Sequence, residues 1–192
     1  MKKFCLILPL LLCACASFNS AGLSVRSDLR LVSDKSIYYD VKDTSVMATR
    51  INRIIRKRLK DAGWKIGTNK KTTRYSYSIF TDTKTYTVNH VIPTQNGGAI
   101  VAPETLSYPF FSVEIMDNKT YENVYEAQIA LSSDRTYAEL EKFVGISTPS
   151  LFLTEDKVWD IECASEYDGE KEVEQCSLKD PNAPPEPLFE LP

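Results

Sequence analysis

Hydrophobic and polar residues alternate along several stretches of the chain, which is the pattern of β-strands with one buried face. This alternation predicts strands over residues 25–32, 37–41 and 64–66. Residues 74–88 are rich in Thr and Tyr and alternate as well, which predicts either one long strand or two strands that break near Asp82.

Residues 110–132 alternate on both sides of the turn signal Asp117-Asn118-Lys119, and therefore predict a β-hairpin. Residues 89–109 contain three prolines and two adjacent glycines, and we expect them to form a loop. Residues 134–144 predict a short helix whose inward side chains are Tyr137, Leu140 and Phe143.

One segment follows a helical period instead. Ser45 ends an Asp-Thr-Ser cluster typical of a helix N-cap, and Gly63 is a typical helix stop. Six apolar residues between them share one arc of the helical wheel, interrupted only by Arg58: Met47, Ile51, Ile54, Ile55, Leu59 and Ala62. The opposite side, which we call the basic helix face, carries Arg50, Arg53, Arg56, Lys57 and Lys60.

The first residues have the composition of an export signal. Two lysines precede an apolar run of about ten residues, which is too short to span a bilayer as a helix. The step from Ala14 to Cys15 resembles a bacterial lipobox, and predicts a lipoprotein signal peptide over residues 1–14 with lipid on Cys15. Cys13 fits that pattern less well, and an ordinary cleaved signal is the alternative. By resemblance to lipoprotein sorting, Ala16 favours the outer membrane.

Two cysteines remain beyond Cys15, and an even pair in an exported protein predicts a disulfide. Cys163 and Cys176 flank a segment that looks like a hairpin. A turn at Gly169-Glu170 would place the two cysteines directly opposite each other, whereas a turn at Asp168-Gly169 would place them diagonally.

The expected fold class is α+β: an antiparallel sheet with one long amphipathic helix packed on one face, plus a C-terminal disulfide hairpin. The predicted organisation has five parts along the chain. They are the signal peptide (1–14), a lipidated tether (15–24), the α+β domain (25–160), the hairpin extension (161–180) and a Pro-rich disordered tail (181–192).

Charge and motifs narrow the functional classes. The formal net charge is −3, which argues against a nucleic-acid binder. The single histidine, His90, has no partner that sequence spacing positions, and motifs for nucleotides, metals or catalytic nucleophiles are absent from the sequence. We therefore expect a protein without enzymatic activity, cofactor or metal. The basic helix face is a candidate surface for lipid headgroups or a partner.

From Leu23 to Thr87, the order of these pieces resembles the TraT family of outer-membrane lipoproteins. The resemblance lies in the strand that begins Leu-Ser-Val-Arg-Ser, the segment Ile37–Ser45, the amphipathic helix with its Gly-Trp-Lys-Ile ending, and the Tyr-rich strand; a weaker echo covers Phe111–Phe143. Such proteins are implicated in surface exclusion during conjugation and in resistance to complement. The family's central apolar segment, thought to enter the outer membrane, is here reduced to Val91–Pro109.

The resemblance implies an outer-membrane lipoprotein that acts by binding or blocking at the cell envelope. It implies membrane contact through the lipid and an envelope protein as partner, and it leaves a homo-oligomer open. The reduced central segment favours an alternative, a periplasm-facing accessory lipoprotein of a secretion, conjugation or transport complex. Sequence does not decide between the surface and the periplasmic side of the membrane.

Overall fold

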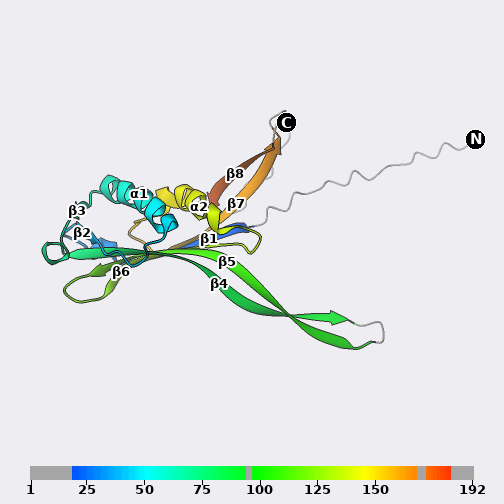
Figure 1. Ribbon diagram of the computed structural model, residues 1–192. Coiled ribbons are helices and arrows are strands. Elements are labelled where there is room, and N and C mark those ends of the chain that lie inside the picture. The colour runs from blue at the N-terminus through cyan, green and yellow to red at the C-terminus, as the bar shows by residue number, and fades with distance from the viewer. Residues whose placement is uncertain (1–18, 94–96, 168–171, 183–192) are drawn as a thin grey trace, which may run out of the picture.

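The computed structural model describes residues 19–93, 97–167 and 172–182 of the chain. An eight-stranded sheet carries two helices on one face (Figure 1). The strands are β1 Asn19–Ser27, β2 Ser36–Tyr39, β3 Lys65–Gly67, β4 Tyr75–Pro93, β5 Ala99–Asp117, β6 Asn123–Leu131, β7 Lys157–Tyr167 and β8 Glu172–Lys179. The helices are α1 Val46–Asp61 and α2 Leu140–Ser147, and the 3-10 turns are η1 Leu29–Leu31, η2 Lys70–Thr72, η3 Tyr137–Glu139 and η4 Thr148–Ser150.

The sheet is mixed rather than purely antiparallel, which corrects the expected fold class in part. Its strand order is β3-β2-β4-β5-β6-β1-β7-β8, and β2 runs parallel to both of its neighbours. The chain leaves β2, forms α1 and returns as β3, and a strand that returns through a helix pairs in parallel. The remaining neighbours pair antiparallel.

Helix α1 occupies the segment with the helical period, and α2 adds a second helix beside it. The Ser45 side chain accepts a hydrogen bond from the Ala48 backbone N–H at 3.0 Å, and Gly63 has a φ of 84°, the left-handed conformation that glycine adopts most easily. The helix side turned to the sheet is fully buried at Ala48, Ile51, Ile55 and Leu59. These side chains join one hydrophobic core with the inner face of the sheet.

Strand β1 begins before the predicted boundary of the domain. Residues from Asn19 onward pair with β6 and β7, so the predicted tether over 15–24 is wrong from Asn19 onward. The cause is packing, because the side chains of Ala21, Leu23 and Val25 are buried in the hydrophobic core. The signal peptide, Cys15 and residues 183–192 of the predicted tail lie outside the described residues.

The expected loop over residues 89–109 is also wrong. Strands β4 and β5 pair without interruption from Tyr75 opposite Asp117 to Pro93 opposite Ala99, so that most of the segment belongs to one long hairpin. Prolines are tolerated in this part because neither strand has a third strand beside it, and a missing backbone N–H breaks no further ladder.

The β7–β8 hairpin confirms the predicted disulfide. Cys163 lies directly opposite Cys176, and their sulfur atoms are 2.10 Å apart. This register agrees with the Gly169-Glu170 turn and excludes the diagonal alternative, although residues 168–171 themselves lie outside the described residues.

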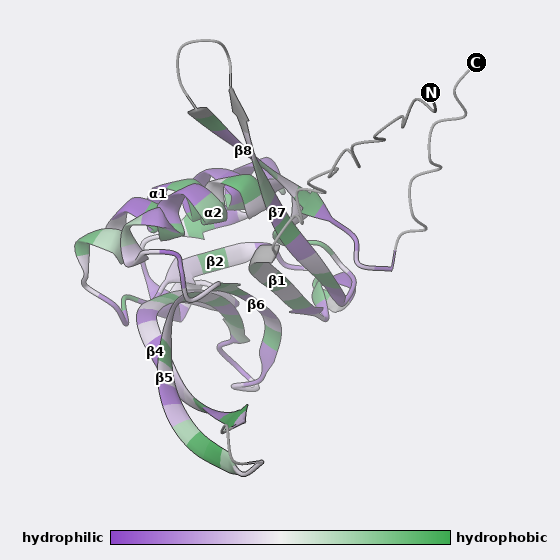
Figure 2. Cartoon of the chain, turned by 90° about the vertical axis from the view of Figure 1, so that its right-hand side faces the viewer, coloured by the Kyte–Doolittle hydropathy of each residue, from purple (hydrophilic) through white to green (hydrophobic). Residues whose placement is uncertain are grey.

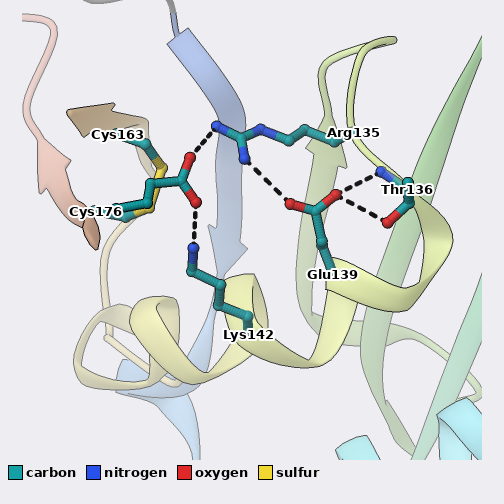
Figure 3. A network of polar contacts seen from close by, with 7 residues as sticks. Arg135, Thr136, Glu139, Lys142, Cys163 and Cys176 are labelled. Atoms are coloured by element: carbon teal, nitrogen blue, oxygen red, sulfur yellow. Dashed lines mark hydrogen bonds and ion pairs between the residues drawn. A yellow bond between two sulfur atoms is a disulfide. The ribbon is translucent and has the colours of Figure 1, made fainter. Parts of the chain in front are cut away.

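A polar network ties this hairpin to the start of α2 (Figure 3). The Glu174 carboxylate on β8 accepts hydrogen bonds from both Arg135 and Lys142. Arg135 also pairs with Glu139 at 3.1 Å, and Glu139 accepts hydrogen bonds from the backbone N–H and the hydroxyl of Thr136 at 2.7 and 2.9 Å. The hairpin is therefore held by a covalent bond within it and by charge contacts from β8 to Arg135 and Lys142.

Candidate functional site: the β4–β5 arm

The most distinctive feature of the molecule is the outer half of the β4–β5 hairpin, which we call the arm (residues 83–93 and 99–109). Strand β2 pairs with β4 only as far as Tyr77, and β6 pairs with β5 only from Phe110 onward. Beyond these points the arm projects from the sheet as a two-stranded ribbon (Figure 1). Both of its edges therefore lack a neighbouring strand within the described residues.

The end of the arm, which we call the apolar tip, exposes four large aliphatic side chains. Their exposed fractions are 67% for Val91, 51% for Ile92, 59% for Ile100 and 59% for Val101. Val91 lies opposite Val101, and Ile92 lies opposite Ile100. Since adjacent pairs point to opposite sides of a ribbon, both faces of the tip are apolar. Figure 2 shows the hydrophobic colouring near the end of the β4–β5 hairpin.

The middle of the arm is polar and is held by cross-strand side-chain contacts. His90 Nε2 lies 2.6 Å from a carboxylate oxygen of Glu104. Sequence spacing assigns His90 no partner, because the two residues become neighbours only in the register of the hairpin. Two further contacts of this kind join the rings of Tyr86 and Tyr108, 5.6 Å apart, and place Lys84 Nζ 3.4 Å from the centre of the Phe110 ring. Such pairs stabilise a ribbon that has no core of its own.

The basic helix face lies on α1, away from the arm. All five of its side chains are exposed, and within the described residues an ion pair is found only for Arg50, whose guanidinium lies 3.7 Å from Glu141. Arg58, which interrupts the apolar arc, instead donates hydrogen bonds to the carbonyl oxygens of Leu151 and Pro149 at 3.3 and 3.1 Å. The structure thus keeps the predicted face available to solvent.

Two further kinds of functional element are metal-binding groups and membrane-spanning helices. Among the described residues, one group of metal-ligand atoms clusters closely, and it consists of Cys163, Glu174 and Cys176. Its two sulfurs are joined in the disulfide and its carboxylate already binds Arg135 and Lys142, so the group offers no free ligand. No helix in the described part of the chain is long and apolar enough to cross a membrane.

The ribbon form of the arm is what sequence reasoning missed, because residues 89–109 were expected to form a loop. The available signal was the symmetry of two apolar pairs, Val91-Ile92 and Ile100-Val101, about position 96, in a segment that also holds Gly97-Gly98. Cys163 and Cys176 lie where they were predicted, whereas Cys15 lies outside the described residues.

Comparison with known proteins gives structural resemblances alone. No protein-family model and no curated protein matches the chain. A PDZ domain protein from Parabacteroides distasonis superposes with a TM-score of 0.46 at 10% identity, over 79% of this chain and 41% of that one. Two structures of the PelC dodecamer from Paraburkholderia phytofirmans give TM-scores of 0.38 and 0.36 at 13% identity, over 67% of this chain. This chain spans less than half of the PDZ domain protein. None of these resemblances indicates the function of this chain.

Proposed function

We propose that this chain is a non-enzymatic, lipid-anchored protein of the bacterial outer membrane that docks a partner protein of the envelope through its arm. The observation that carries the proposal is the apolar tip, four exposed aliphatic side chains at the end of a projecting ribbon. Contiguous exposed apolar surface typically marks an interaction site.

The energetics of the tip favour insertion into a socket. Burying one Val or Ile side chain contributes about 1.5–3 kcal/mol, so four of them can supply much of a specific contact. Because both faces of the tip are apolar, a flat partner surface would cover only half of it. A recess that encloses the ribbon end would cover the whole tip.

The proposed anchor places the arm near the membrane. Cys15 precedes Asn19, the first residue of β1, by four residues, and an extended chain of that length reaches about 14 Å. The strand pairing puts Asn19 at the same end of the sheet from which the arm projects. A lipid on Cys15 would therefore hold the arm close to proteins in or beside the same membrane.

Two biological roles fit such an anchored docking protein. One is the TraT-like role of surface exclusion or complement resistance, in which the arm would block a partner at the surface. The other is that of a periplasm-facing accessory subunit of a secretion, conjugation or transport complex, and the arm favours it because a docking element stands where the family has its apolar segment. Protease treatment of intact and permeabilised cells, with an antibody to residues 151–192, separates the two.

Photo-cross-linking in living cells tests the docking itself. A photoreactive amino acid at position 92, in the tip, is expected to give a discrete protein adduct. The same amino acid at position 85, in the polar middle of the arm, serves as the matched control and is expected to give little. Adducts to lipid alone, or equal adducts from both positions, would overturn docking by the tip. In parallel, Cys15→Ser is expected to abolish palmitate labelling, and continued labelling would show that the assignment of the lipid to Cys15 is wrong.

A further inference from the structure

Positive charge is concentrated in one segment of this acidic chain. Residues 46–74 carry ten Lys and Arg side chains against one Asp, whereas the whole chain carries 23 against 26 acidic residues. This segment comprises α1, β3 and η2. An anionic ligand is therefore attracted to this part of the molecule although the protein as a whole would repel it.

An open cavity of about 790 Å³ lies at the end of the sheet away from the arm. It is bounded by η2 on one side and by the turn of residues 117–121 on the other. Aliphatic and acidic side chains are missing from its lining, which holds amides, hydroxyls, two tyrosine rings and lysines. The lining residues that matter here are Tyr38, Thr68, Asn69, Lys71, Lys119 and Tyr121.

Hydrogen bonds hold the turn that presents Lys119. The buried Asp117 carboxylate accepts a hydrogen bond from the Lys119 backbone N–H at 2.7 Å and another from Arg74 Nε at 2.9 Å. The Asn118 side chain donates to the Thr73 carbonyl at 3.1 Å and so joins the turn to the segment that follows η2. Such support reduces the conformational entropy that a ligand must remove on binding.

The opposite wall is ordered in the same way. Asn69 Oδ1 accepts a hydrogen bond from the Lys71 backbone N–H at 2.9 Å, and Lys70 Nζ lies 3.2 Å from Asp40. Lys71 and Lys119 themselves are exposed, and the described residues contribute no ion pair to either ammonium group. Two cations thus lie on hydrogen-bonded segments on either side of one cavity.

Tyr121 adds an independent observation. Its φ is 60°, a conformation that side-chain-bearing residues of its size rarely adopt, and its side chain is 74% exposed. Backbone strain of this kind gathers at binding sites. Here the strain displays an aromatic ring at the rim of the cavity instead of burying it.

We infer that this cavity binds an acidic polysaccharide. Lys71 and Lys119 would donate charge-assisted hydrogen bonds to sugar carboxylates. The rings of Tyr38 and Tyr121 offer apolar faces for sugar rings, and the amides and hydroxyls pair with sugar hydroxyls. An acidic peptide fits less well, because protein interfaces rely on apolar anchors that this lining lacks. The inference does not depend on the arm.

Calorimetry with the full-length protein in detergent tests this site. The probe is a hexamer of galacturonic acid, with maltohexaose as the neutral comparison and inorganic polyphosphate as the non-sugar polyanion. We expect the acidic hexamer to bind at least about tenfold more tightly than maltohexaose. The affinity for the acidic hexamer should fall by about fivefold in each of two variants, Lys71→Gln and Lys119→Gln. Lys57→Gln, which removes the same charge from the exposed face of α1, is the matched control and should have no effect.

Tyr121→Gly separates a binding role from a structural one. Glycine relieves the strained φ, so the melting temperature should rise by about 2 °C while hexamer binding falls by about tenfold. A lower melting temperature with unchanged binding would overturn the role of the ring. Equal binding of polyphosphate together with an equal loss in Lys57→Gln would overturn the site, because it would show a general polycation effect.

Discussion

The two halves of the β4–β5 hairpin share one register but differ completely in their surroundings. In the inner half, which we call the base (residues 75–81 and 111–117), Tyr77, Ile79, Phe111 and Val113 are fully buried. In the arm, the same two strands continue with every apolar tip residue exposed. The base lies between β2 and β6 and is covered by the helices, whereas the arm has no such neighbours.

The difference in burial between the base and the arm matches a difference in their side chains. Along the face that is buried in the base, the arm continues with Thr83, Thr85 and Thr87, which favour strands but contribute little to a core. Apolar residues return only at the tip. The polar middle of the arm is therefore suited to exposure to solvent, and its apolar tip is suited to burial by a partner. This is the pattern of a docking element.

The largest effect on stability is expected from a substitution in the buried base. Phe111→Ala removes a fully buried aromatic ring and should reduce the free energy of unfolding by about 3–5 kcal/mol, measured by urea denaturation. Val101→Ala in the arm is the matched control and should change it by less than about 0.5 kcal/mol. Equal losses would mean that the arm is packed as firmly as the base.

The β7–β8 hairpin provides the next test, because it projects like the arm but carries a covalent bond. Replacing both Cys163 and Cys176 with Ser should cost about 3 kcal/mol in the chain-entropy view of a short disulfide loop. Hydrogen exchange is expected to rise in β7 and β8 and to remain unchanged in the arm. An unchanged stability would show that the ion pairs of Glu174 hold the hairpin without the disulfide.

A substitution on the outer face of the base is expected to change the free energy of unfolding by a smaller amount, and this change should depend on pH. Burial raises the pKa of Glu114, and the charge of Glu126 directly opposite raises it further. A raised carboxyl pKa means that the fold is most stable below the ordinary value of 4.5 and loses stability as the pH rises and Glu114 ionises. Glu114→Gln should therefore stabilise the protein by about 0.2–1 kcal/mol at pH 7 and have no effect at pH 4.

Unfolding in urea at the two pH values measures this difference. Glu122→Gln, in an exposed turn, is the control and should differ from the native protein by less than about 0.5 kcal/mol at pH 7. A destabilised Glu114→Gln at pH 7 would show that the carboxylate is needed as an ion.

Local sequence patterns predicted those parts of the fold that depend on a single helix or a single short hairpin. Cys163 and Cys176 could be placed opposite each other because a short hairpin has few registers. The partners of β2 could not be predicted, since parallel pairing depends on contacts that close only after α1 has folded back. The arm was missed because Pro93, Pro103 and Gly97-Gly98 indicate a loop, and only the pairing of β4 with β5 as far as Pro93 opposite Ala99 reveals a ribbon.

The same limit applies to the sites. Exposed cations such as Arg53 follow directly from a helical wheel, because a single element decides their placement. The contact of His90 with Glu104, and the cavity that joins Lys71 to Lys119, each need two segments brought together by tertiary pairing. Candidates within one helix or one recognised hairpin could be read from the sequence, and those that need segments whose pairing the sequence did not reveal could not.

Changes in the apolar tip are expected to affect stability least. They also give the sharpest contrast between the arm and the base. Val91→Ser with Ile100→Ser removes one aliphatic side chain from each face of the ribbon end. Because both residues are exposed, the free energy of unfolding should change by less than about 0.5 kcal/mol, whereas the protein adduct from position 92 should disappear. Thr85→Ser with Thr87→Ser is the control and should preserve the adduct. A loss of several kcal/mol in the tip variant would instead mean that the tip is covered within the folded protein, and the arm would then be part of its core.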